Sequence, residues 1–191
     1  AIATPERFGG LGLGLVELGI VAQACGAQTA GAPFLTTSYG AACALLACED
    51  ADLKQRWLPA LAAGAAIGAV AFAEGSEILP APQTIFAGGV LTGSKAGVTA
   101  GLRADFAIVW ALHQGRPALV LAELAGASRR ATPTYDNSRL VADIAFETPA
   151  RLLLDGEAAQ RAARHVLAHM AVVTAHEQTG GAGELLRIGC D

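Results

Sequence analysis

The sequence predicts an α+β fold, with an N-terminal helical domain, a central antiparallel β-sandwich or barrel, and a return to helix. Three observations lead to this prediction. Apolar residues recur at helical spacing through residues 11–63, short apolar runs alternate with turn residues through 68–154, and a helical stripe resumes after 156. Short strands joined by turns are typical of sandwiches and barrels, so the middle of the chain is expected to close on itself.

Three helices are predicted in the N-terminal part. After a break at 31–33, residues 36–38 are good cap residues for the second helix, which is expected to reach Cys48. The acidic run 49–52 marks the start of the third, because a helix N-terminus favours negative charge. That helix should extend to Ala63, with a kink or a new turn at Pro59. The first helix carries an apolar row made of Val16, Ile20, Ala24 and Ala27.

The strands are read from short apolar runs and the turns between them. Gly88-Gly89 separates two runs and signals a hairpin, and residues 113–117 form a second turn. The expected strands are 69–73, 84–86, 90–93, 106–110, 118–122, 131–135, 140–146 and 152–154.

Helix is predicted again from Gly156. Its apolar stripe consists of Val166, Leu167, Met170 and Val173. The pair Gly180-Gly181 is expected to end it near Thr179, because glycine commonly terminates helices. Residues 184–188 would then begin a further short helix.

The composition excludes several classes of protein. The net charge is -4, and Lys54 and Lys95 are the only lysines, so the clustered cations that nucleic-acid binding requires are absent from the sequence. With 53% hydrophobic and only 16% charged residues, disorder is not expected. The apolar run 60–73 is too short for a membrane span, which needs about 20 residues. The stretch 11–25 does not resemble a signal peptide, because it lacks a basic leader and contains Glu17.

The four cysteines predict free thiols rather than disulfides or a metal site. They stand at positions 25, 43, 48 and 190, without a C-x-x-C pair. We interpret them as small buried hydrophobic residues in a reducing compartment, which indicates a cytoplasmic protein.

No catalytic residue or metal site is evident from the residues alone. His165 and His169 have the i, i+4 spacing of metal ligands, but neighbouring arginines and the lack of a third ligand favour an ordinary amphipathic helix. Glu74 and Glu77 could form an acid–base pair, although a solvated turn is the preferred interpretation. The glycine cluster 9–14 lacks the strand-then-helix context of a dinucleotide-binding loop.

Several local motifs occur in a fixed order along the chain. They are P-E-x-x-G-G-x-G at 5–12, the W-L-P helix end at 56–64, the strand ending in Glu at 71–74, L-x-G-x-K at 91–95, A-D at 104–105, D-x-[ST]-R within 134–139, and a glycine pair at 179–182. In this order they resemble the acyl-CoA dehydrogenase family, over essentially the whole chain. The sequence is therefore identified as a partial member of that family, and its Ala and Gly content and its preference for Arg over Lys indicate a bacterial protein.

The resemblance implies FAD-dependent α,β-dehydrogenation of an acyl-CoA thioester, as in fatty-acid β-oxidation. In the family, a glutamate removes the α-proton while the flavin accepts a hydride, and an electron-transfer flavoprotein then receives the electrons. The implied partners are therefore acyl-CoA, electron-transfer flavoprotein, and further subunits of a homo- or hetero-oligomer. No nucleic acid and no membrane span are expected.

The family pattern also assigns flavin contacts. Phe72 and Ala73 would line the flavin edge through main-chain groups, and Gly97, Val98 and Thr99 occupy the W-x-T/S segment, with the Thr99 hydroxyl near the ring. The sequence departs from the pattern in two side chains, since Ala73 replaces a common Thr and Gly97 a common Trp. Residues 75–80 also replace the usual G-x-G-S-D loop.

The resemblance divides the chain into a partial N-terminal α domain (1–66), a flavin-contacting β domain (67–155) and the first part of a C-terminal helical bundle (156–191). The family's catalytic glutamate belongs to later helices of that bundle, so no catalytic residue is assigned within residues 1–191 and this chain alone is expected to be inactive. Two alternatives are a non-catalytic partner subunit of a heteromeric enzyme, which the departures at Ala73 and Gly97 favour, and a decayed chain without function.

Overall fold

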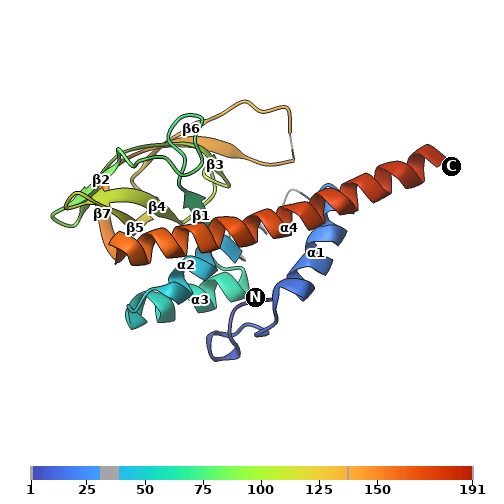
Figure 1. The fold of residues 1–191 in the computed structure, drawn as a ribbon, viewed down its shortest axis with the longest axis horizontal. Coiled ribbons are helices and arrows are strands. Elements are labelled where there is room, and N and C mark those ends of the chain that lie inside the picture. Colours follow the sequence, from blue (N-terminus) through green and yellow to red (C-terminus); the bar gives the residue numbers. More distant parts are fainter. Residues whose placement is uncertain (1, 31–38, 137, 191) are drawn as a thin grey trace.

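The structure, a computed structural model, describes residues 2–30, 39–136 and 138–190. A β-barrel packs on a layer of helices, and one long helix runs beneath the barrel and beyond it (Figure 1). The helices are η1 (Glu6–Phe8), α1 (Leu15–Ala27), α2 (Ala42–Ala47), α3 (Ala51–Ala63) and α4 (Gly156–Cys190). The strands are β1 (Gly68–Ala71), β2 (Ile85–Ala87), β3 (Val90–Thr99), β4 (Phe106–His113), β5 (Arg116–Glu123), β6 (Ser128–Ala131) and β7 (Val141–Asp155).

The predicted α+β class and the barrel are confirmed. The strands form one seven-stranded sheet that closes through β4-β2-β3-β7-β5, because β5 pairs back onto β4. Most pairs are antiparallel, whereas β1 and β2 run parallel to successive parts of β4. The predicted hairpin at Gly88-Gly89 joins β2 to β3, and both glycines have positive φ (57° and 80°), as a tight two-residue turn requires.

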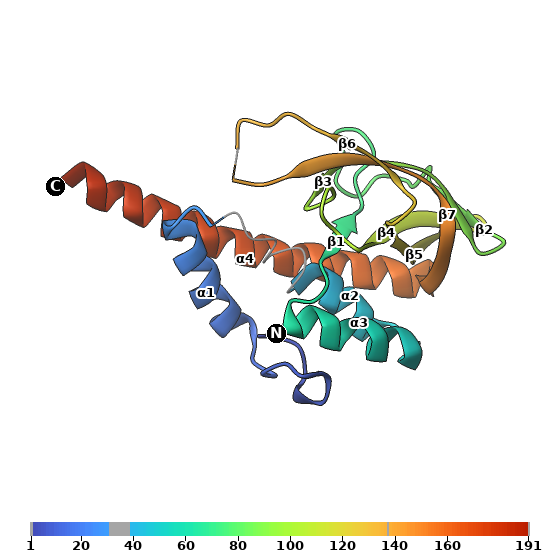
Figure 2. The same ribbon diagram turned by 180° about the vertical axis from the view of Figure 1, so that it is seen from behind.

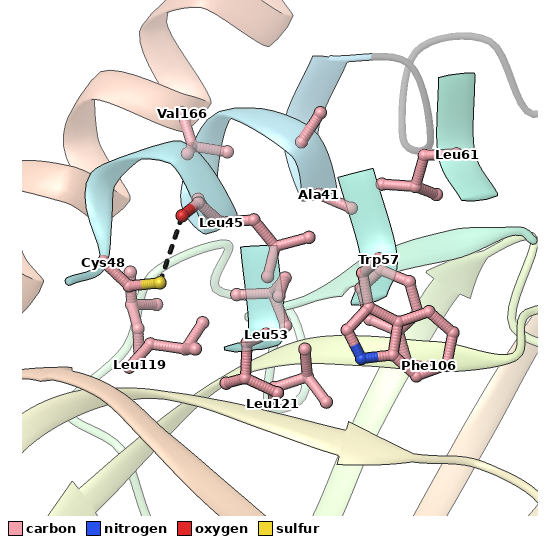
Figure 3. Packing of buried hydrophobic residues seen from close by; sticks show 14 of the residues in the cluster. Ala41, Leu45, Cys48, Leu53, Trp57, Leu61, Phe106, Leu119, Leu121 and Val166 are labelled. Atoms are coloured by element: carbon pink, nitrogen blue, oxygen red, sulfur yellow. Dashed lines mark hydrogen bonds between the residues drawn. The ribbon is translucent and has the colours of Figure 1, made fainter. Parts of the chain in front are cut away.

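Strand β4 is buried on both faces, which explains its unbroken apolar run. Phe106 and Trp110 point toward the helices, while Ala107, Val109 and Ala111 point into the barrel. Small side chains fill much of the barrel interior, so the alanine-rich composition reflects a narrow barrel rather than a membrane segment. Figure 3 shows the helix-facing side, where Leu53 and Trp57 from α3 pack above Phe106 and Leu121.

Strand β7 corrects the expectation of two strands at 140–146 and 152–154. It is one strand of 15 residues with Pro149 inside it. Pro149 is the last residue paired with β3, and Ala150 is already paired with β5. Proline has no N–H to donate to a neighbouring strand. The sheet tolerates Pro149 because the residue stands where β7 changes its partner from β3 to β5.

Strand β6 covers residues 128–131, so the prediction of a strand at 131–135 placed it too far along the chain. Tyr135, which was predicted to lie in that strand, is fully exposed. The strand is polar in sequence, pairs with β7 along its whole length, and is also anchored by one side chain. The Arg129 guanidinium donates to the carbonyl oxygens of Gly101, Leu102, Ala104 and Leu124 at 2.5–3.3 Å. This arginine ties the β6 strand to the turn before β4.

The prediction that Gly180-Gly181 ends the last helix was wrong, since α4 is continuous over 35 residues. Helix α1 crosses α4 at this point (Figure 2). A Cβ on Gly180 would lie 1.9 Å from the Gln23 carbonyl oxygen, and one on Gly26 would lie 1.8 Å from the Glu177 carbonyl oxygen. The glycines therefore allow two helix backbones to approach, and do not terminate a helix.

Helix α1 buries a different face from its predicted apolar row. Val16 and Ile20 are 69% and 64% exposed, whereas Leu18 and Ala22 are buried against α4. The contact with α4 therefore lies on the face of α1 that carries Leu18 and Ala22, and Val16 and Ile20 point away from it. Exposed apolar residues of α1 and α4 include Val16, Ile20, Val172, Leu185, Leu186 and Ile188.

The third helix is confirmed. The Asp50 carboxylate caps α3 by accepting from the Leu53 amide at 3.0 Å, and Pro59 is accommodated within the helix. The end of α2 agrees with the prediction near Cys48, while the expected break at 31–33 and the caps at 36–38 lie outside the described residues. The cysteine expectation holds only in part: all four are free, but only Cys48 is buried and Cys190 is exposed.

The helix crossing yields a matched pair of substitutions. We expect Gly180→Ala to lower the free energy of unfolding by roughly 2 kcal/mol, because the new methyl group meets backbone that must move. Gly183→Ala, in the same helix with open space around it, should instead raise that free energy by up to about 1 kcal/mol. Denaturant unfolding measures both, and equal effects of the two substitutions would contradict the close crossing.

Candidate functional site

The structure brings together the two segments singled out in the sequence. Phe72 and Ala73 follow β1, and residues 97–99 end β3. The Ala96 amide donates to the Ala73 carbonyl oxygen at 3.0 Å, which places the segments side by side at one end of the barrel. This hydrogen bond connects residues that are far apart in sequence and could not be inferred from local pattern.

The predicted residues differ in what they present to a ligand. Phe72 is 3% exposed and packs with Trp110 on the helix-facing side, and Val98 is 2% exposed inside the barrel. Their side chains belong to the core, so only their main-chain groups can face a ligand. Ala73, Gly97 and Thr99 are partly or fully accessible.

A β-bulge directs the Thr99 side chain outward. Leu91 and Lys95 face inward on β3, and the pairing with β7 shifts between Lys95 and Val98. Gly97 takes up the extra residue with φ +62°. After the bulge Val98 faces inward, which leaves Thr99 on the outer face. Without the bulge, the strict alternation of a strand would bury position 99.

An acidic side chain accompanies the bulge. The Asp143 carboxylate on β7 accepts from the Gly97 amide at 3.1 Å and from the Arg130 guanidinium at 2.8 Å. These hydrogen bonds, the one from Gly97 first, hold the pKa of Asp143 below its ordinary value.

A buried ion pair lies beside the two segments. The Lys95 side chain is fully buried, and its Nζ lies 2.6 Å from Glu74 Oε1 and 3.3 Å from the Phe72 carbonyl oxygen. Burial lowers the pKa of Lys95, and Glu74 opposes that shift. Because a buried ammonium without a counter-charge is costly, Glu74 is what allows a lysine at this inward position.

Glu74 also organises the loop that follows it. Its carboxylate accepts from the Thr84 hydroxyl at 2.7 Å, the Thr84 amide at 3.0 Å and the Gln83 amide at 2.8 Å. Partial burial raises the pKa of Glu74, but hydrogen bonds from Lys95 and Thr84 outweigh it and lower the pKa to about 2. The preferred interpretation as a solvated turn was therefore wrong for Glu74, whereas Glu77 is exposed.

A hollow of about 840 Å³ opens beside this network and is lined by residues of β3, β6 and β7. Its lining includes Arg130 and Asp143 as well as Glu74, Thr84 and Lys95. The segment 75–83 forms part of its rim through Gly75 and Gln83. The Trp110 indole fixes this segment by donating to the Pro80 carbonyl oxygen at 2.9 Å.

The two histidines on α4 do not form a metal centre with the described residues. Their rings are in contact, tilted by 48° with centroids 4.0 Å apart, and His169 is hydrogen-bonded to the Tyr39 hydroxyl. Burial lowers the pKa of His169, and the neighbouring His165 adds to this. Within the part of the chain that the structure describes, no three His, Cys, Asp or Glu side chains are grouped to hold a metal ion.

Sequence reasoning missed the Glu74–Lys95–Thr84 network and the role of Asp143. One signal was available for the network, because Lys95 is a lone lysine in a strand whose other inward side chains, Leu91 and Val98, are apolar. No comparable signal marks Asp143, since an aspartate on the outer face of a strand is usually solvated.

The two members of the ion pair should respond differently to replacement. Glu74→Gln leaves the fully buried Lys95 ammonium without a counter-charge, so we expect a loss of about 3 kcal/mol in the free energy of unfolding. Lys95→Met leaves the carboxylate with the Thr84 and Gln83 donors, and should cost only roughly 1 kcal/mol. Urea titration compares them, and a greater loss for Lys95→Met would contradict this assignment.

The low pKa of Glu74 also predicts the direction of an acid effect. Its pKa is about 2 in the folded protein and about 4.5 in the unfolded chain. The unfolded chain takes up the proton first, so the stabilisation is complete above about pH 4.5 and is lost as the pH falls toward 2. The stability difference between the wild type and Glu74→Gln should therefore shrink on acidification. A difference independent of pH would argue against an ionised Glu74.

Comparison with known proteins extends these observations. Residues 1–65 match the family model described as acyl-CoA dehydrogenase, N-terminal domain. The chain is 35% identical over 111 residues to acyl-CoA dehydrogenase FadE28 of Mycobacterium tuberculosis, an alignment that covers 58% of this chain and 33% of that relative. No helix of the described residues is both long and apolar enough to cross a membrane.

Solved structures share the complete arrangement. The ChsE4–ChsE5 complex from Mycobacterium tuberculosis superposes with a TM-score of 0.83 at 25% identity, covering 97% of this chain and 51% of the other. A Tcur3481–Tcur3483 steroid ACAD superposes with a TM-score of 0.81 at 27% identity, covering 98% of this chain and 52% of the other. The chain thus spans about half the length of these structures and a third of its curated relative. The N-terminal domain match, the curated relative and the shared fold thus make this chain similar to acyl-CoA dehydrogenases, in agreement with the ordered motifs.

Proposed function

We propose that this chain is part of a FAD-dependent acyl-CoA dehydrogenase that introduces an α,β double bond into an acyl-CoA thioester. The observation that carries the proposal is the hydrogen bond from the Ala96 amide to the Ala73 carbonyl oxygen. It joins the two segments to which the family pattern assigns the flavin. We further propose the domain division 1–66, 67–155 and 156–191, with the middle domain contacting the cofactor.

The residues present are compatible with a flavin edge formed mainly by backbone. The main chain of Phe72, Ala73, Gly97 and Val98 and the hydroxyl of Thr99 would hold it, because the Phe72 and Val98 side chains are committed to the core. When bound, FAD supplies the hydride acceptor of the reaction. The loss of side chains at Ala73 and Gly97 leaves Thr99 as the hydroxyl donor of this segment.

The proton-abstracting base is assigned to none of the described residues. Glu74 lies nearest the two segments, but a carboxylate with a pKa of about 2 and four hydrogen-bond donors is a poor base at neutral pH. We propose that the base comes from outside residues 1–191. Acyl-CoA as substrate, electron-transfer flavoprotein as acceptor, oligomer formation and a cytoplasmic location in fatty-acid β-oxidation belong to the same proposal.

A second candidate function is a non-catalytic partner subunit in a heteromeric acyl-CoA dehydrogenase. Two observations favour it. The positions of Ala73 and Gly97 carry no polar side chain that could face a flavin, and the similar ChsE4–ChsE5 complex contains two different proteins. Purification of this protein from its native host distinguishes the two candidates. If it is a partner subunit, a different, flavin-loaded member of the family should co-purify with it.

The enzyme proposal predicts a coloured protein. Expressed from the complete reading frame, it should carry FAD, and acyl-CoA should bleach the oxidised flavin band. Thr99→Val should weaken FAD binding by roughly tenfold through the loss of one hydrogen bond. Thr92→Val, an exposed threonine of the same strand away from the segment, should leave binding unchanged. Protein that stays colourless after reconstitution with FAD would overturn the proposal.

A further inference from the structure

The bulge in β3 frees two backbone amides from the ladder with β7. Lys95 pairs with Ile144 and Val98 with Ala142, so Ala96 and Gly97 together lie opposite the single residue Asp143 and are not paired in the ladder. An amide that leaves a ladder needs another acceptor. The Ala96 amide donates to the Ala73 carbonyl oxygen at 3.0 Å, and the Gly97 amide donates to Asp143 Oδ1 at 3.1 Å.

Asp143 therefore connects three strands at this point. Besides Gly97 on β3, its carboxylate accepts from the Thr132 hydroxyl at 3.2 Å, just beyond β6, and from Arg130 Nη2 at 2.8 Å. Arg130 is 83% exposed, and an ion pair so accessible to solvent contributes little stability. Among the three donors, Gly97 is the one that belongs to the segment carrying Thr99, so its hydrogen bond is the contact through which Asp143 can act on that segment.

That hydrogen bond supports the backbone geometry on which Thr99 depends. Gly97, with φ +62°, is the extra residue of the bulge. Its insertion turns the Val98 side chain inward and the Thr99 side chain outward. If the bulge slips by one residue, the Thr99 hydroxyl turns toward the barrel interior. The Asp143 carboxylate, which accepts the hydrogen bond from the Gly97 amide, opposes such a slip.

We propose that Asp143 is a positioning residue of the flavin site, which acts by holding the Gly97 amide so that the 97–99 segment presents the Thr99 hydroxyl and its main chain to the cofactor. This inference rests on the proposed function, and it adds a residue from β7 to a site otherwise formed by the end of β1 and β3.

The test compares four variants of the protein expressed from its complete reading frame. Asp143→Ala removes the acceptor, whereas Asp143→Asn retains an oxygen that can accept from Gly97. Arg130→Ala removes only the exposed ion pair. Asp155→Ala is the matched control, because Asp155 is also on β7, pairs with Arg116 at 2.6 Å, and has the same side-chain exposure of 32% as Asp143. The readouts are the FAD dissociation constant, the visible spectrum of bound flavin, and amide hydrogen exchange over residues 96–99.

We expect Asp143→Ala to weaken FAD binding by about tenfold, to shift the flavin spectrum and to accelerate exchange of the Gly97 amide. Asp143→Asn should restore binding to within about threefold, and Arg130→Ala and Asp155→Ala should leave all three readouts near wild type.

If the wild type carries flavin and Asp143→Ala changes neither FAD binding nor amide exchange, this inference is overturned while the proposed function stands. Equal weakening by Asp155→Ala overturns it too, since the effect would then be general. If the wild type itself binds no flavin, the proposed function and the inference fail together. Exchange at Gly97 is measured without cofactor and detects loss of the bulge even in a variant that binds no FAD.

Discussion

The buried ion pair between Lys95 and Glu74 is the interaction on which the candidate site depends. It joins an inward position of β3 to the residue that follows the β1 segment, and the same carboxylate fixes the start of β2 through Thr84. A carboxylate serving four donors cannot move far without leaving several of them unpaired. The two proposed flavin-contacting segments are therefore held in register by a polar network within an otherwise apolar barrel end.

The packing around the site fixes the position of the barrel relative to the helices. Alternate residues of β4 belong to two separate cores, so a shift of this strand would disturb the barrel interior and the helix layer at once. On the other side of the molecule, α1 and α4 approach through glycines, and the Arg139–Glu177 ion pair ties the loop before β7 to α4 close to the same crossing. The long helix thus contacts the barrel and the N-terminal helix along one continuous element (Figure 1).

Features that are set by residues close in sequence were predicted, whereas features that are set by contacts between distant segments were not. The Gly88-Gly89 hairpin and the start of α3 at the acidic run 49–52 are set by neighbouring residues, and both were predicted. Gly180 resembles a helix terminator until α1 is placed against it, and Val16 and Ile20 resemble a core face until the narrow crossing is known. The family pattern supplied residues 72–73 and 97–99 but not Asp143, whose partner Gly97 lies on another strand at a distance of 46 residues in sequence.

The central claim is that the flavin lies against the backbone of the two segments and the outward Thr99 hydroxyl. A crystal structure of the FAD-loaded protein tests this most directly. The account predicts that the isoalloxazine ring lies within hydrogen-bond distance of the main chain at Ala73 and of Thr99 Oγ1, with the Glu74–Lys95 pair intact. A flavin bound elsewhere on the chain, or a site in which Phe72 and Val98 leave the core to contact the ring, would contradict it.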